Sequence, residues 1–254
     1  MKEENIIFGR NPVLTVLRNK PTQIEKIYLR YGVEGKPIDD IIYLSRKNSV
    51  PFSFLDKEKF KKIENEIQVP QTQGVIAYLS LIEYLELYEL IDIAFQKEKQ
   101  PILVFLEKIQ DPQNLGSIAR TAECVGAQGL ILTTKKTAPI NSTVVKASTG
   151  AILNLPIVKV DSTIETIEDL KKFGFWIIGT TPKAEIDFWD FNYDVPIVVI
   201  FGSEGRGLSQ STLKHCDAVI KIPIFGKTES LNASVSAAII LYEIRRQRSL
   251  SVPK

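Results

Sequence analysis

The sequence predicts an α/β protein in which a small α/β domain precedes a larger one, built on a mostly parallel sheet with helices on both faces. The chain has 254 residues, of which 44% are hydrophobic, so it exceeds one ordinary domain and can bury a core in each of two. From Pro101 onward, short and strongly apolar segments alternate with helical ones. That alternation is typical of parallel strands covered on both faces.

Residues 1–80 alternate between helical and strand periodicity, which predicts the smaller domain. In chain order the pattern predicts a helix at 11–17, a strand at 24–29, a helix at 38–45, a strand at 51–54, a helix at 57–63 and a strand at 74–79. Residues 81–100 carry apolar positions at helical spacing before a charged run, so they predict a linker helix. A flexible hinge fits the composition of this segment equally well.

Residues 101–254 contain five short segments that are almost wholly apolar, as expected of buried parallel strands. These segments lie at 102–106, 129–132, 175–178, 197–201 and 218–222. In open parallel sheets, ligands bind at the loops that leave the carboxyl ends of the strands. The candidate functional residues are therefore those in the loops that follow these segments.

The first candidate loop follows the strand predicted at 102–106 and opens a helix with Asp111-Pro-Gln-Asn-Leu-Gly-Ser-Ile-Ala-Arg120. Asn114 is placed to cap this helix, and Arg120 projects from its next turns. Taken alone, the two residues are explained as a helix cap and a solvated charge.

The second candidate loop is rich in glycine, with Gly202, Gly205 and Gly207 close together after a buried strand. Glycines let the backbone turn sharply and approach a ligand closely. The spacing is not Gly-x-Gly-x-x-Gly, and no Gly-Lys-Ser/Thr follows, so the familiar nucleotide-phosphate loops are disfavoured. A structural turn is the alternative.

The third candidate loop begins at Ile222 and leads into a helix with Ser230 or Asn232 near its start. Helix capping accounts for one of these two residues. The small residues from Ala233 to Ala238 permit close helix packing, so a packing face is the alternative interpretation.

Several classes of protein are disfavoured by what the sequence lacks. His215 is the only histidine, so a metal site built from several imidazoles is excluded, and its place near a predicted helix end favours a non-catalytic residue. Cys124 and Cys216 are not paired in spacing, which argues against a disulfide framework or a zinc module. There is also no Gly-x-Ser-x-Gly nucleophile elbow.

The charge and the start of the chain give two further expectations. The formal net charge of +2 does not by itself mark a nucleic-acid-binding protein, so contacts to phosphates would depend on local clusters of Lys and Arg. The first residues are charged, and no apolar stretch is long enough to cross a bilayer. A soluble, cytoplasmic protein is therefore expected.

Taken together and in this order, the three loops resemble the three motifs of the SpoU branch of the SPOUT RNA methyltransferases. The matching segments are Asp111-Pro-x-Asn-x-Gly-x-x-x-Arg120, Gly202-Ser-Glu-Gly-x-Gly207, and Ile222-Pro followed by Ser230-Leu-Asn-x-Ser234. The resemblance covers residues 101–254. Ala233 stands where the family often has Val, a small change in packing volume.

The resemblance implies a deep trefoil knot in the C-terminal part of the sheet, S-adenosylmethionine bound among the knotted loops, no metal, and a homodimer that uses the helix at 234–248. The residues implied to bind the cofactor are Thr180, Gly202, Ile222 and Leu231. The residues implied in catalysis are Arg120, Asn114, Glu204, Ser230 and Asn232.

Residues 1–80 are similar to the ribosomal-protein-like RNA-binding domain of the RlmB-type branch, with Phe8-Gly-Arg-Asn-Pro as the opening signature. This likeness implies 2′-O-methylation of a guanosine in 23S rRNA, with tRNA or another rRNA nucleotide as the alternative. Basic clusters are expected to contact the RNA, although each could equally be a solvated face. They comprise Arg10, Arg18, Lys20, Arg30, Arg46, Lys47, Arg245, Arg246 and Arg248.

Methyl transfer to a ribose hydroxyl requires collinear oxygen, methyl and sulfur atoms and a way to stabilise charge on the oxygen. Arg120 is expected to provide that stabilisation, because a guanidinium stays protonated and offers no acceptor for a proton.

A non-catalytic RNA-binding or ribosome-assembly factor is the rival function. A Rossmann-type dehydrogenase is disfavoured by the missing phosphate fingerprint.

Overall fold

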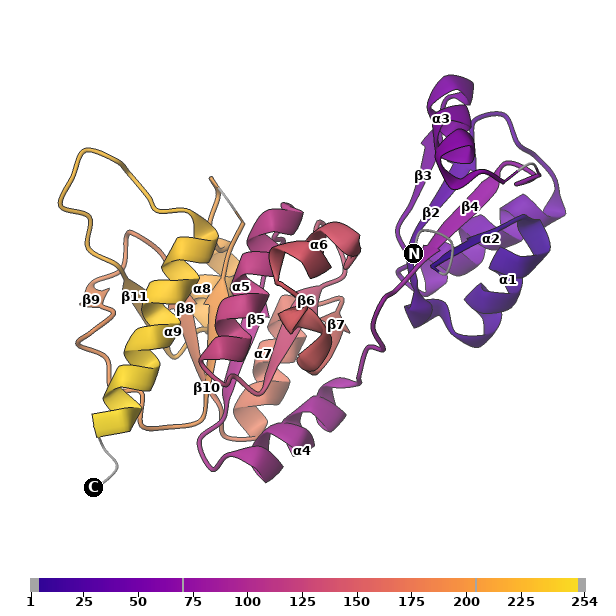
Figure 1. Cartoon of the computed structure of the whole chain (residues 1–254). Helices are drawn as coiled ribbons and strands as arrows, with labels where there is room; N and C mark the ends of the chain where they lie inside the picture. The colour runs from indigo at the N-terminus through magenta and orange to yellow at the C-terminus, as the bar shows by residue number, and fades with distance from the viewer. Residues whose placement is uncertain (1–4, 70, 204, 251–254) are drawn as a thin grey trace. The chain divides into compact units, whose positions relative to one another are not determined.

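The computed structural model describes residues 5–69, 71–203 and 205–250 of the chain. It forms two compact units: the first runs to Tyr84 and also takes in Pro139–Asn141, and the second comprises the remaining residues. Each unit has its own sheet and its own hydrophobic core (Figure 1).

The first unit is built on a four-stranded sheet with the strand order β1-β4-β2-β3. The pair β2–β3 is parallel, and the pairs β1–β4 and β2–β4 are antiparallel. The elements are β1 (Ile6–Phe8), α1 (Arg10–Asn19), a 3₁₀ turn (Pro21–Gln23), β2 (Ile24–Arg30), α2 (Lys36–Lys47), β3 (Phe52–Leu55), α3 (Lys57–Ile67) and β4 (Val75–Leu79). All six elements predicted for this part of the chain are present, and β1 is an additional strand.

The core of the first unit joins the apolar stripes of α1 and α2 to the sheet. Val13 and Leu17, four residues apart, lie on one face of α1, and Ile38 and Ile41 lie on one face of α2. These side chains share one buried cluster with Ile27 of β2. The helical periodicity that predicts these helices is therefore the one that buries them.

The second unit is built on a seven-stranded sheet with the order β7-β6-β5-β10-β8-β11-β9. All of its described strand pairs are parallel. The strands are β5 (Ile102–Leu106), β6 (Gly129–Thr133), β7 (Ile157–Val160), β8 (Trp176–Thr180), β9 (Ile186–Asp187), β10 (Ile197–Phe201) and β11 (Ala218–Lys221). The helices are α4 (Leu87–Lys97), α5 (Pro112–Cys124), α6 (Ser142–Ala147), a 3₁₀ turn (Ala151–Asn154), α7 (Thr163–Lys172), α8 (Gln210–His215) and α9 (Ala233–Leu250).

Helices cover both faces of this sheet, as predicted. Leu103 and Phe105 of β5 share a buried cluster with residues of α4 and α7. Val104 and Leu106 are also fully buried and, by the alternation of side chains along a strand, point to the opposite face. Figure 1 shows α5 and α9 side by side on one face of the sheet. None of the described helices is both long and apolar enough to cross a membrane.

The five strands predicted in this part of the chain are β5, β6, β8, β10 and β11. β7 and β9 are additional strands. The predicted linker helix is α4, and its residues Leu90, Ile91 and Ala94 belong to the core of the second unit. Leu85, just before α4, donates its backbone N–H to the carbonyl oxygen of Ile157 at 2.9 Å.

Candidate active site at the carboxyl edge of the sheet

The three motif loops leave strands that lie close together in the sheet. β5, β10, β8 and β11 are consecutive in the strand order, and their pairing is parallel. The loops that follow β5, β10 and β11 therefore emerge at the same edge, as does the loop that follows β8. The structure thus brings together three segments that are far apart in the sequence, at the edge where parallel sheets bind ligands.

The loop that follows β5 ends in a capped helix, but Asn114 is not the cap. Asp111 is the N-cap residue of α5, and its Oδ1 accepts a hydrogen bond from the backbone N–H of Gln113 at 3.0 Å. The prediction for Asn114 was therefore wrong by one helical turn. Asn114 is buried, and its Nδ2 donates to Asp111 Oδ2 at 3.2 Å. Two acceptor oxygens allow the Asp111 carboxylate to cap the helix and hold this amide at once.

The glycine of this first motif is required for packing. A Cβ atom on Gly116 would lie 2.8 Å from the carbonyl oxygen of Val144 and 3.0 Å from the backbone nitrogen of Ser148. Gly116 thus lets α5 approach α6 closely. The first motif combines two separate roles, a capped helix start at the sheet edge and a close helix contact further along.

Arg120 is exposed, and its guanidinium has no hydrogen-bond or ion-pair partner among the described residues. It lies six residues beyond Asn114, which is about 9 Å along a helix axis. Its guanidinium therefore makes no hydrogen bond to Ser230 or Asn232 in the part of the chain that the structure describes. A free guanidinium is a ready donor for a phosphate or a negatively charged oxygen.

The glycine loop, defined here as Gly202–Leu208, folds back on itself. Ser203 and Gly207 form an isolated antiparallel bridge, in which the Gly207 N–H donates to the Ser203 carbonyl oxygen at 2.8 Å. A Cβ atom on Gly202 would come within 2.5 Å of the Gly207 carbonyl oxygen and closer still to the Gly207 carbonyl carbon. Gly205 and Gly207 have φ values of 75° and 64°, which favour glycine. The predicted catalytic residue Glu204 lies outside the described residues.

In the third motif, Asn232 caps α9. Its Oδ1 accepts hydrogen bonds from the backbone N–H of Ser234 at 2.8 Å, from that of Val235 at 3.4 Å and from the Ser234 hydroxyl at 2.6 Å. Ser230 is exposed, and 39% of Leu231 is accessible. Of the two candidate caps, Asn232 fills the role, which leaves Ser230 available to a ligand.

Thr180 ends β8, and its hydroxyl donates to the carbonyl oxygen of Ile200 in β10 at 2.9 Å. This bond ties β8 to β10, the strand that precedes the second motif loop. Ile222, directly after β11, is partly exposed. Thr180 and Ile222, two of the four residues predicted to bind the cofactor, therefore lie at the carboxyl edge.

Most of the arginines predicted to contact RNA have structural partners. Arg245 donates to the carbonyl oxygens of Val125 and Gly126, which fastens α9 to the end of α5. Arg248 donates to three further backbone carbonyl oxygens, and burial lowers its pKa to about 10. These two arginines hold the fold together.

Other members of the predicted set are also engaged. Arg246 pairs with Glu243 at 2.7 Å, and Arg18 pairs with Asp40 at 3.4 Å. Arg10 donates to the carbonyl oxygens of Gln73 and Glu34. Three exposed cations of the set make no side-chain hydrogen bond, ion pair or ring contact with any described residue: Lys20, Arg30 and Lys47.

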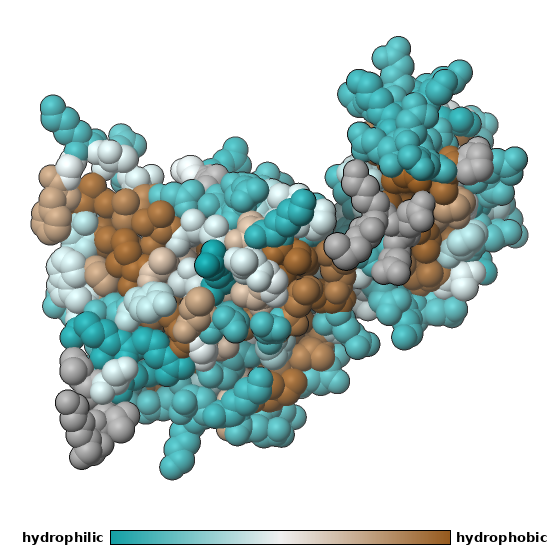
Figure 2. Space-filling model, in the orientation of Figure 1, coloured by the Kyte–Doolittle hydropathy of each residue, from teal (hydrophilic) through white to brown (hydrophobic). Residues whose placement is uncertain are grey.

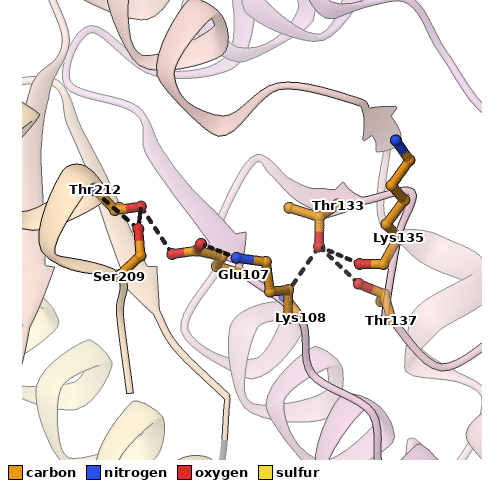
Figure 3. A network of polar contacts seen from close by, with 7 residues as sticks. All are labelled: Glu107, Lys108, Thr133, Lys135, Thr137, Ser209 and Thr212. Carbon is orange, nitrogen blue, oxygen red and sulfur yellow. Dashed lines mark hydrogen bonds and ion pairs between the residues drawn. The ribbon is translucent and has the colours of Figure 1, made fainter. Parts of the chain in front are cut away.

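Sequence reasoning missed a buried carboxylate at the sheet edge. Glu107 directly follows β5 and is 3% exposed, and it lies in a network of polar side chains with Lys108, Thr133, Ser209 and Thr212 (Figure 3). The available signal was an acidic residue at the end of an otherwise apolar strand. Buried carboxylates need partners, so such a residue predicts a polar network.

The single histidine takes part in a local contact. His215 Nδ1 lies 2.8 Å from the carbonyl oxygen of Ser211, one turn earlier in α8. Among the described residues, no group of three or more His, Cys, Asp or Glu side chains could hold a metal ion.

Both parts of the chain match families of known proteins. The SpoU rRNA methylase family model matches residues 101–242, and the family model for RNA 2′-O ribose methyltransferase substrate binding matches residues 6–85. YacO of Bacillus subtilis, assigned to the TrmH family of tRNA/rRNA methyltransferases, is 34% identical over 98% of both chains. The tRNA/rRNA methyltransferase slr0955 of Synechocystis is 38% identical over 98% of this chain and 64% of its own length.

Solved structures agree with these relatives. The SpoU methyltransferase AviRb from Streptomyces viridochromogenes, in complex with the cofactor AdoMet, matches with a TM-score of 0.62 and 25% identity, over 97% of this chain and 91% of that one. An AdoMet-bound rRNA methyltransferase from Sinorhizobium meliloti has the same fold, with a TM-score of 0.60 over 95% of this chain and 87% of that one, at 24% identity. The structures of AviRb and of the Sinorhizobium enzyme contain bound AdoMet. The chain therefore belongs to the SpoU family of RNA methyltransferases.

Proposed function

We propose that this protein methylates a ribose 2′-hydroxyl of RNA with S-adenosylmethionine as the methyl donor, and that its substrate is a guanosine of 23S rRNA. The observation that carries the proposal is the convergence of the three motif loops at the carboxyl ends of β5, β10 and β11. Residues 101–254 would catalyse the methyl transfer, and residues 1–80 would bind the RNA. Residues 81–100 would link the two domains. Relatives named for tRNA and rRNA support an RNA substrate.

The residues at this edge fit S-adenosylmethionine, which supplies a methyl group activated by a sulfonium sulfur. A Cβ atom added to Gly207 would meet no heavy atom within 4 Å, so a ligand can approach the backbone of the glycine loop there. Leu231 offers partly exposed apolar surface for a purine ring. The residues that would hold the cofactor are Thr180, Gly202, Ile222 and Leu231.

Arg120 would stabilise the negative charge that develops on the ribose oxygen as its proton leaves. A ribose hydroxyl is a very weak acid, so this charge is a large part of the barrier. The guanidinium of Arg120 is unpartnered among the described residues, carries a permanent charge and has no lone pair to accept a proton. Asn114, Ser230 and Asn232 would position the nucleotide, and Glu204 would orient Arg120 or the loops.

The first unit would bind the RNA through exposed cations. The side chains of Lys20, Arg30 and Lys47 are exposed and have no partner in the part of the chain that the structure describes. Arg245 and Arg248 of α9 are instead held by the fold. Contacts to phosphates weaken steeply with salt. RNA binding that did not change with salt would contradict this assignment.

We propose further that the protein is a homodimer through its second unit. Val235 and Tyr242 are 46% and 56% exposed, and residues seven apart lie on one face of a helix. Figure 2 shows hydrophobic residues on the face of the second unit where α9 lies. A partner's α9 would cover this stripe and bring the exposed Arg120 of one copy near the loops of the other.

The trefoil knot is part of the same proposal. Its support is the strand order, in which β10 lies between β5 and β8 and β11 follows β8. After β5, β6 and β7 have formed one side of the sheet, the chain continues through β8 and β9 on the other side and then returns to place β10 between β5 and β8.

The test is transfer of tritium from labelled S-adenosylmethionine to undermethylated total RNA, comparing the wild-type protein with Arg120→Ala and Arg120→Lys. We expect label at one ribose, mapped by its resistance to alkaline cleavage, and loss of transfer in both variants with unchanged RNA affinity. Near-normal turnover in Arg120→Lys would contradict the role of the planar guanidinium. Label in tRNA would replace the proposed substrate. No cofactor binding at all would establish the non-catalytic alternative.

A further inference from the structure

Glu107 makes two side-chain contacts that leave neither carboxylate oxygen without a partner. Oε1 accepts from the Lys108 ammonium at 2.8 Å, and Oε2 accepts from the Thr212 hydroxyl at 2.9 Å (Figure 3). Burying a carboxylate costs free energy that such contacts only offset, and an apolar side chain of similar size would often fill the same space at no loss of stability. The presence of a charge here therefore calls for a role other than core packing.

The contacts of Glu107 reach both ends of the glycine loop. At its start, the Glu107 N–H donates to the carbonyl oxygen of Phe201, the residue before Gly202, at 2.9 Å. At its end, the Thr212 hydroxyl that bonds Glu107 lies 2.7 Å from the hydroxyl of Ser209, which follows Leu208 directly and caps α8. The residue directly after β5 thus contacts both ends of the glycine loop.

We propose that Glu107 is a positioning residue that fixes the glycine loop in the arrangement that binds S-adenosylmethionine. This inference rests on the proposed function, because it assigns to Glu107 the alignment of a loop that is itself proposed to hold the cofactor. Three glycines within the loop give its backbone many accessible conformations. A loop fixed at both ends needs less ordering when a ligand binds, and the affinity is higher for that reason.

The same network has a second arm that does not reach the glycine loop. The backbone N–H of Lys108 donates to the Thr133 hydroxyl at 2.9 Å, and that hydroxyl lies 2.8 Å from the hydroxyl of Thr137. Thr133 is buried like Thr212, but its contacts stabilise the loop after β6. The chain therefore contains its own control, a buried threonine in the same network that should not affect the cofactor.

The experiment compares Thr212→Val with Thr133→Val in the full-length protein. Each substitution removes one buried hydroxyl with little change of shape. Calorimetric titration with S-adenosylmethionine measures the Kd, and thermal unfolding measures stability. We expect both variants to lose similar stability, Thr212→Val to raise the Kd about tenfold because the binding-competent loop becomes a minor state, and Thr133→Val to leave the Kd within about twofold of the wild type.

Two further variants make the result specific. Thr212→Ser keeps the hydroxyl and should restore the wild-type Kd. Glu107→Gln keeps the shape of the side chain but replaces an acceptor oxygen with a donor, so it should raise the Kd in the same direction even if Thr212→Val does not fold. At saturating cofactor, methyl transfer by these variants should approach the wild-type rate, because the loop is then ordered.

The outcomes separate this inference from the proposed function. If the wild type binds S-adenosylmethionine and Thr212→Val and Thr133→Val change the Kd equally, Glu107 has only a structural role and the inference is overturned. If Glu107→Gln and Thr212→Val bind like the wild type, the loop does not depend on Glu107, which also overturns it. If the wild type does not bind S-adenosylmethionine, the proposed function fails and the inference fails with it.

Discussion

Replacing Gly202 with alanine should disable cofactor binding far more than it destabilises the fold. The added methyl group would come within 2.5 Å of the Gly207 carbonyl oxygen and closer to the Gly207 carbonyl carbon, where only backbone atoms are available to move. Ordinary contacts between such atoms are about 3.5 Å, so the two arms of the glycine loop must separate by about 1 Å. Overpacking of this kind typically costs about 1–3 kcal/mol.

The functional loss should be larger than this cost in stability suggests. A displacement of about 1 Å at a site that positions a ligand can lower its function about 100-fold. For a unit of this size, about 1–3 kcal/mol corresponds to a fall in Tm of roughly 2–12 °C. We therefore expect a modest fall in Tm together with a rise of about two orders of magnitude in the Kd for S-adenosylmethionine, measured by calorimetric titration.

Gly205→Ala is the matched control in the same loop. Its methyl group would meet no heavy atom within 4 Å, although the φ of 75° carries a strain of about 1–2 kcal/mol for a residue with a side chain. It should therefore lose comparable stability while its Kd changes only a few-fold. If Gly202→Ala bound the cofactor as tightly as Gly205→Ala does, the close approach at Gly202 would not be what shapes the site.

Two other predictions follow from single residues. Asn232→Ala should destabilise the protein by about 1 kcal/mol, because it removes the α9 cap. Asn232→Asp keeps an acceptor for the helix N–H groups, so it should keep the Tm and still lose methyl transfer if the amide contacts the nucleotide. If Asn232→Asp were as active as the wild type, the role of this residue would be restricted to capping. Burial raises the pKa of the Cys216 thiol to about 12, so at pH 8 a disulfide reagent should modify only the exposed Cys124 rapidly in the native protein and both thiols after unfolding. Because the thiol of Cys216 has a higher pKa in the folded than in the unfolded protein, the protonated thiol favours the folded state. This contribution to the free energy of unfolding should be complete below about pH 9 and lost as the pH rises toward 12. Rapid native modification of two thiols would contradict this burial.

The sequence predicted β5 and β10 most directly, because both strands are apolar on both faces. β5 and β10 are fully buried along their whole length, so their composition alone identifies them. β7 is only half buried over its four residues, and Lys159 lies within it, so it has no such signal. β1 is three residues long and pairs with β4, which is far away in the chain, so local periodicity could not reveal it.

The edge at which the motif loops lie was predictable, but several contacts of these loops were not. Loops after parallel strands were expected to carry the chemistry, and the strand order places the three motif loops at one edge. Which residue caps α5 depends on where the helix begins, and a shift of three residues moves the cap from Asn114 to Asp111. Glu107 escaped notice because its partner Thr212 is 105 positions away in the chain.

The arginines show why charge clusters in a sequence are a weak guide to a nucleic-acid interface. Arg245 and Arg248 lie in one basic run with Arg246, yet both bind backbone carbonyl oxygens. Arg245 binds those at the end of α5, and Arg248 binds those before β5 and β10. A guanidinium has five donors in a fixed plane, which suits a cluster of backbone carbonyls as well as a phosphate. Arg120 differs because no described residue satisfies it. An exposed guanidinium without an internal partner is therefore the better indicator of a substrate contact, and Arg120 meets that condition where Arg245 and Arg248 do not.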